Sequence, residues 1–96
     1  MIAKINWLDS KRFIPDIRVK YCPIIKFTNE ETCSWSAEIH IIKNDLANRK
    51  SIAEVHYLFS NAPTSNICEG NQFELFEGNR KVADGIFIDD KSASKL

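Results

Sequence analysis

The chain has 96 residues, of which 44% are hydrophobic and 27% are charged. This length and composition suit a single globular domain and exclude the apolar-poor, highly charged class of disordered chains. Lys plus Arg number 13 and Asp plus Glu also number 13, so no overall positive charge favours binding to nucleic acid. We expect one domain over residues 1–90 and a disordered polar tail over residues 91–96.

The cysteines and the N-terminal segment bear on the cellular compartment. Cys22, Cys33 and Cys68 are odd in number and have no Cys-x-x-Cys spacing, which predicts free, unreactive thiols in a reducing compartment. The opening MIAKINWLD has no cationic stretch followed by an apolar run, so the sequence predicts no secretion signal. No apolar run approaches the length of a membrane span. We therefore expect a soluble, cytoplasmic protein without a membrane partner.

Six segments are predicted to be β-strands from their alternation of apolar and polar residues. The first four cover residues 2–8, 20–28, 34–42 and 51–59, and the last two form a hairpin over 70–89 around a turn at 77–80. Segment 9–19 is predicted to be an ordered loop, because Pro15 interrupts any ladder of hydrogen bonds there. Pro23 places the second strand at an edge or a bulge.

The spacing of these strands predicts the fold class. Regular strands with turns between them favour a small all-β barrel over a sandwich, since closure removes exposed strand edges. Trp7 and Trp35 are predicted to lie in the core. In the hairpin, Asp84 shares a predicted face with Val82. A carboxylate on that face is expected to lie near a mouth of the barrel or to pair with a cation such as Arg80.

The order of the strands and two motifs resemble the C-terminal β-barrel, or third domain, of bacterial translation elongation factor Tu. The residues shared with that family are Tyr21 and Pro23 in the second strand and Glu77, Gly78, Arg80, Val82 and Gly85 in the hairpin. The resemblance covers nearly the whole chain and implies a six-stranded antiparallel closed barrel. It does not imply GTP hydrolysis, because the sequence has no G-x-x-x-x-G-K-[ST] loop for phosphates.

The departures from that family concern its binding side. In the elongation factor this barrel helps to hold the T-stem of aminoacyl-tRNA, with the Glu-Gly turn and the Tyr-x-Pro strand on the binding side. Cys22, Ile24, Thr28 and Phe76 stand where the family has polar or cationic residues. The result is a predicted apolar patch ringed by charge, which suits a protein partner better than phosphates. The predicted partner-binding residues are Cys22, Ile24, Lys26, Phe76, Glu77, Gly78, Asn79, Arg80 and Phe87.

Other candidate sites are weaker. His40 and His56, with Glu38 and Glu54, are predicted to lie on outward faces, where two histidines and a carboxylate form a candidate zinc site. Cross-strand pairing on a solvated sheet face explains the same pattern better, so we expect no metal and no other cofactor. Cys22 has no adjacent base to activate its thiol, so we expect no enzyme activity. Glu77 either contacts a ligand or caps the turn, and the sequence does not separate these two roles.

The sequence thus predicts a non-enzymatic binding module that acts on a protein partner. It leaves open whether that partner is a component of translation or a toxin that the chain neutralises as an immunity protein. The alternative is a tRNA- or ribosome-associated accessory factor of translation. Its RNA contacts would be Lys20, Lys26, Arg80 and Lys81.

Overall fold

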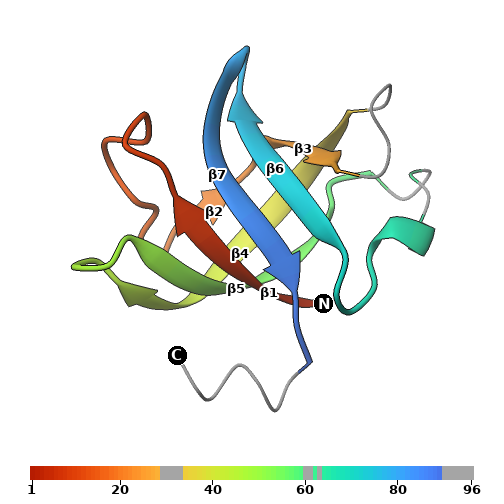
Figure 1. Ribbon diagram of the computed structural model, residues 1–96, viewed down its shortest axis with the longest axis horizontal. Helices are drawn as coiled ribbons and strands as arrows, with labels where there is room; N and C mark the ends of the chain where they lie inside the picture. The colour runs from red at the N-terminus through yellow and green to blue at the C-terminus, as the bar shows by residue number, and fades with distance from the viewer. Residues whose placement is uncertain (29–33, 60–61, 63, 90–96) are drawn as a thin grey trace.

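A computed structural model describes residues 1–28, 34–59, 62 and 64–89, which form seven β-strands and one short 3-10 helix (Figure 1). The predicted tail at 91–96 and Cys33 lie outside the described residues. No helix in this part of the chain is long and apolar enough to cross a membrane. The elements are β1 (Ile2–Trp7), β2 (Lys20–Tyr21), β3 (Ile24–Phe27), β4 (Trp35–Asp45), β5 (Lys50–Tyr57), η1 (Thr64–Asn66), β6 (Gln72–Glu77) and β7 (Arg80–Phe87).

Six of these strands close into a barrel. Around the ring, β4 pairs with β3, β3 with β6, β6 with β7, β7 with β1 and β1 with β5, and β5 returns to β4. Every one of these pairings is antiparallel. The seventh strand, β2, also pairs with β4. The prediction of an all-β fold with a six-stranded antiparallel closed barrel is therefore confirmed.

Strands β2 and β3 follow one line of pairing along β4, interrupted at Cys22 and Pro23. Tyr21 lies opposite Ile39 and Ile24 lies opposite Ser36, so the register is the same on both sides of the interruption. Pro23 has no N–H to donate to a ladder. Its carbonyl oxygen still accepts a hydrogen bond from the backbone N–H of Ala37 at 2.9 Å. The proline therefore splits the predicted strand over 20–28 into two short strands.

A β-bulge at Val82 changes which residues of β7 face the core. Leu75 on β6 pairs with Ala83, whereas the next residue, Phe76, pairs with Lys81. Val82 is thus an extra residue on β7, and the alternation of inward and outward side chains shifts by one position beyond it. Val82 and Ala83 are both buried.

The bulge overturns two predictions made from simple alternation. Phe87, a predicted partner-binding residue, is only 1% exposed and packs in the core, with its ring centroid 4.9 Å from that of Phe73. Asp84 lies outward instead of sharing the core face with Val82. Its carboxylate pairs with Lys81 at 2.8 Å rather than with Arg80. Sequence alternation cannot place residues beyond a bulge whose position it does not reveal.

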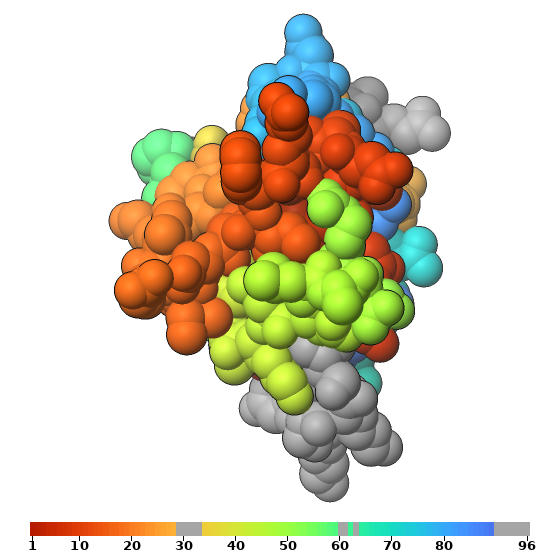
Figure 2. Space-filling model, turned by 90° about the vertical axis from the view of Figure 1, so that its left-hand side faces the viewer, coloured from red at the N-terminus to blue at the C-terminus, as the bar shows by residue number. Residues whose placement is uncertain are grey.

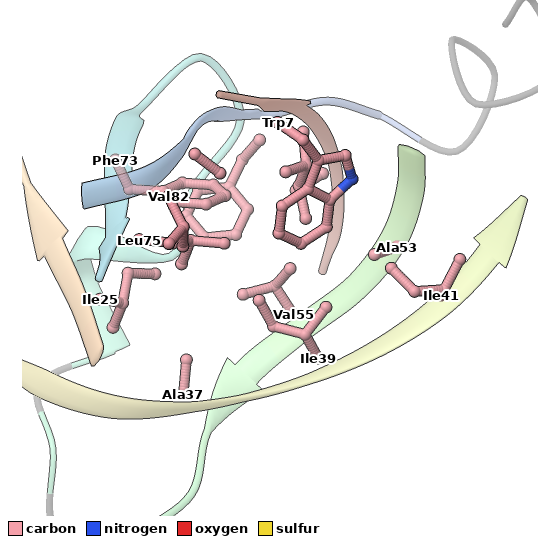
Figure 3. Packing of buried hydrophobic residues seen from close by; sticks show 14 of the residues in the cluster. Trp7, Ile25, Ala37, Ile39, Ile41, Ala53, Val55, Phe73, Leu75 and Val82 are labelled. Carbon is pink, nitrogen blue, oxygen red and sulfur yellow. The ribbon is translucent and has the colours of Figure 1, made fainter. Parts of the chain in front are cut away.

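One cluster of buried side chains fills the barrel (Figure 3). Trp7 lies within it as predicted, and its indole N–H donates to Ser51 Oγ at 2.7 Å. Trp35 is only partly buried and packs against the edge of the cluster. At Gly85 the Phe73 ring approaches so closely that a Cβ atom would lie 2.2 Å from a ring carbon. A larger residue there would force the Phe73 ring or the strand to move.

Candidate binding surface

The outer face of β3 and β6 brings together three of the predicted binding residues. Ile24 lies opposite Phe76 in the register, and both side chains are half-buried. The Lys26 ammonium lies 4.5 Å from the centroid of the Phe76 ring, which is a cation–π contact. Cys22 follows β2 and is exposed. Because Lys26 covers part of Phe76, this apolar patch is smaller than the sequence suggests.

The β6–β7 turn holds the next four predicted residues. Glu77 pairs with Arg80 across the turn, which leaves Gly78 and Asn79 at its exposed tip. Gly78 has a φ of 63°, while Asn79 is not among the described residues with positive φ. Positive φ at the first central residue alone is the pattern of a type II′ hairpin turn. Glycine is the residue that this turn needs there.

The Glu77 carboxylate joins the hairpin to two other parts of the chain. It accepts a hydrogen bond from the Tyr21 hydroxyl at 2.5 Å and pairs with the Lys11 ammonium at 2.8 Å. It also pairs with the Arg80 guanidinium at 2.9 Å. These partners are side chains rather than backbone amides of the turn. Glu77 thus connects the hairpin to β2 and to the loop between β1 and β2.

These contacts shift two pKa values in the network. The hydrogen bond from Lys11, then that from Tyr21, lowers the pKa of Glu77 from 4.5 to about 2. Burial, followed by the hydrogen bond to Glu77, raises the pKa of the Tyr21 hydroxyl. At neutral pH the carboxylate is therefore ionised and the phenol is protonated, which is the state that holds the network together.

The loop between β1 and β2, residues 8–19, is fixed by groups from elsewhere in the chain. The Arg49 guanidinium donates to the carbonyl oxygen of Leu8 at 2.7 Å and to that of Lys11. Asn44 Nδ2 donates to the Pro15 carbonyl at 2.9 Å. Ser10 Oγ donates to a backbone carbonyl of the hairpin, at Lys81, at 2.5 Å. The 8–19 loop is therefore ordered, as the sequence predicts.

The same loop directs large apolar side chains toward solvent. Phe13 is 81% exposed, Ile17 is 59% exposed and Val19 is 51% exposed. Leu46, in the β4–β5 turn, is 64% exposed. Figure 2 shows this turn and the 8–19 loop on one face of the molecule, beneath the tip of the hairpin. We call Phe13, Ile17, Val19 and Leu46 the loop surface.

Sequence reasoning missed the loop surface for a physical reason. Alternation predicts the facing of a side chain only where the backbone is a regular strand or helix. The 8–19 loop is irregular, so the sequence pattern does not indicate whether the side chains of Phe13 and Ile17 face solvent. The available signal was the presence of large apolar residues in a segment where Pro15 prevents a strand.

A second cluster lies on the outer face of β4 and β5. His56 Nε2 lies 2.5 Å from Glu38 Oε2, and His40 Nε2 lies 3.2 Å from the same oxygen. The Lys20 ammonium pairs with Glu38 Oε1 at 3.1 Å. Hydrogen bonds from His56, then His40, then Lys20 lower the pKa of Glu38 to about 2. Glu54, the fourth residue of the predicted constellation, instead accepts a hydrogen bond from the Met1 amino group.

A scan against protein-family models, a search of curated proteins and a search of solved structures each gave no match. The resemblance to the third domain of elongation factor Tu stays a prediction from the sequence.

Proposed function

We propose that the chain is a non-enzymatic binding module whose loop surface docks onto a protein partner. The observation that carries the proposal is the exposure of Phe13, which is 81% exposed on a loop fixed by hydrogen bonds. Loops of about a dozen residues without secondary structure are uncommon in compact domains and are usually functional. Neighbouring exposed apolar side chains mark protein interaction sites on soluble domains.

The anchoring of the loop supports a preformed binding surface. Arg49, Asn44 and Glu77 contact the backbone or base of the 8–19 loop, while Phe13 and Ile17 remain exposed. A surface that is already ordered loses little conformational entropy when it binds. Aromatic side chains that fill a pocket of the partner are among the energetic anchors of protein interfaces. Phe13 fits that role.

The charges around the loop surface indicate the chemistry of the partner. Arg12 and Lys43 are exposed, as is Asp9 on the 8–19 loop, and none of the three makes an ion pair within the described ranges of the chain. A partner with an apolar pocket and acidic groups at its rim would complement both the aromatic anchor and these cations. Within this proposal the partner is a toxin that the chain neutralises as an immunity protein or a protein component of translation, the two classes that the sequence leaves open.

The cations nominated for RNA binding support the protein partner over RNA. Lys20 pairs with Glu38, Arg80 pairs with Glu77, and Lys81 pairs with both Glu74 and Asp84. Lys26 lies over the Phe76 ring. Each of these four side chains already has a partner within the chain. Contact with phosphates would have to replace those interactions, which reduces the net gain in free energy.

The test is site-specific photo-crosslinking in an extract of the source cells. A photo-crosslinkable phenylalanine analogue replaces Phe13 in one protein and Lys4 in a matched control. Lys4 is exposed on the outer face of β1, between Ile52 of β5 and Ile86 of β7 in the register. We expect one protein to crosslink at position 13 and none at position 4, with and without nuclease. Excess unlabelled chain should compete, whereas the Phe13→Asp, Ile17→Asp chain should not.

Two results would contradict this function. Equal crosslinking at both positions, or equal competition by the double variant, would place the interface elsewhere. Loss of the crosslinked species after nuclease would favour the RNA-associated alternative. In that case replacing Arg80 and Lys81 by Ala should weaken tRNA binding and flatten its salt dependence.

A further inference from the structure

The pairing of β4 with β5 places three potential metal ligands on one patch of the outer face. Glu38 lies directly opposite His56 in the register. His40 follows two positions after Glu38 on β4, so its side chain lies on the same face. One ligand atom from each of the three side chains can be chosen so that all lie within 4.8 Å of one another. The barrel thus gathers the histidines without any loop or motif.

Two of the three separations between the donor atoms are close to those of a metal site, and the third is at most 4.8 Å. Ligands bound to a tetrahedral ion at about 2.1 Å lie about 3.4 Å apart. His40 Nε2 lies 3.2 Å from Glu38 Oε2, and His56 Nε2 lies 2.5 Å from the same oxygen. Binding of an ion therefore requires His56 Nε2 and Glu38 Oε2 to move apart by about 0.9 Å. Rotation of side chains on the outer face can supply that movement.

We propose that Glu38, His40 and His56 form a binding site for a divalent transition metal ion of the zinc class. Two imidazoles and one carboxylate are a ligand set that Zn²⁺ accepts, with water in the remaining position. Hydrogen bonding between Glu38 and His56 does not exclude this role. When the ion binds, it takes the place of the proton that Glu38 and His56 share in this hydrogen bond.

The surroundings of the three side chains support the proposal. Lys20 holds Glu38 Oε1 at 3.1 Å, which leaves Oε2 as the oxygen directed at both imidazoles. An outer hydrogen bond of this kind orients a ligating carboxylate. The side chains of His40 and His56 are 47% and 43% exposed, so an ion can reach them from solvent. His56 also lines a cavity of about 430 Å³ together with Tyr57 and Ile67.

The experiment is calorimetric titration of the folded, chelator-treated chain with zinc chloride. Cys22, Cys33 and Cys68 are replaced by Ser in every protein, so that thiols do not contribute. The site variants are His40→Ala, His56→Ala and Glu38→Gln. Glu74→Gln is the control, because it removes a carboxylate that pairs with Lys81 on another part of the barrel. Circular dichroism verifies that each variant is folded.

We expect one Zn²⁺ ion per chain, and we expect each site variant to weaken the affinity by about tenfold or more. The control should bind like the parent. The chain has only two histidines, so their NMR signals should both shift on addition of Zn²⁺ in the parent protein. Absence of binding would overturn the proposal, as would binding that both histidine variants retain. Equal affinity in the denatured chain would also overturn it, because no preformed site would then be involved.

Discussion

The barrel wall and the 8–19 loop are stabilised in opposite ways. In the wall, Phe73 and Phe87 face inward and contribute by removing apolar surface from water. In the loop, Phe13 faces solvent, and order comes from hydrogen bonds that Arg49 and Asn44 donate to backbone carbonyls. The comparison separates the residues that stabilise the barrel from the residues that we propose contact a partner. Substitutions should therefore separate the two properties.

The largest effect is expected from Gly85→Ala in the wall. The new Cβ would lie 2.2 Å from the Phe73 ring, so the ring or the strand must move. We expect a loss of about 3 kcal/mol in the free energy of unfolding, at the upper end for overpacked cores. Denaturant unfolding measures it. Phe73→Leu in the same chain removes the clashing ring carbons, so the double variant should lose less than the sum of the single variants.

A smaller effect is expected from Glu77→Ala, which removes the contact between the loop and the hairpin. Lys11, Tyr21 and Arg80 lose a shared charged partner. We expect a loss of about 1–2 kcal/mol in stability, since the carboxylate is mostly shielded from solvent. Hydrogen exchange should quicken in the 8–19 loop but not in the wall. Glu69→Ala, at an exposed position, is the control and should change neither measurement.

Acid should weaken the same contact. The pKa of Glu77 is about 2 in the folded chain, below its ordinary value of 4.5. A lowered pKa contributes stability above the ordinary value, and this contribution is lost as the pH falls toward the folded value. The free energy of unfolding should therefore decrease from pH 4.5 to pH 2, and less steeply in Glu77→Gln. Equal slopes in the two proteins would contradict the role given to this carboxylate.

The smallest effect on stability is expected from Phe13→Ser. The side chain is 81% exposed, so the free energy of unfolding should change by no more than about 0.5 kcal/mol. Crosslinking and competition for the partner should nevertheless decrease strongly. A large loss of stability would mean that Phe13 packs in the barrel, and the division between wall and loop would be wrong.

The fold was predictable from sequence because most strands are regular. Along β4, Ala37, Ile39 and Ile41 are buried while His40 is exposed, as alternation predicts. The prediction was wrong at Phe87 because a bulge at Val82 adds one residue to β7. A bulge depends on how two strands fit together, which a pattern along one strand does not contain.

The candidate site was predictable only in part. The register brings Ile24, Lys26 and Phe76 together, as the outward faces of their strands suggest. The anchoring of the 8–19 loop depends on Arg49, which is 41 residues away from Leu8 in the sequence. Arg49 also adopts a φ of 55°, which local preference would assign to Gly or Asn. Such long-range contacts arise only after the chain has folded.

The closed ring restricts how another protein can associate with this chain. Each of the six ring strands has a neighbour on both sides within the described structure. Strand addition, in which a peptide extends an open sheet, has no ring strand that is open along its whole length. β2 has only two residues, Lys20 and Tyr21, which is too short to template an added strand. We therefore expect a partner to be recognised through side chains, so that substitutions can change specificity without disturbing the backbone of the barrel.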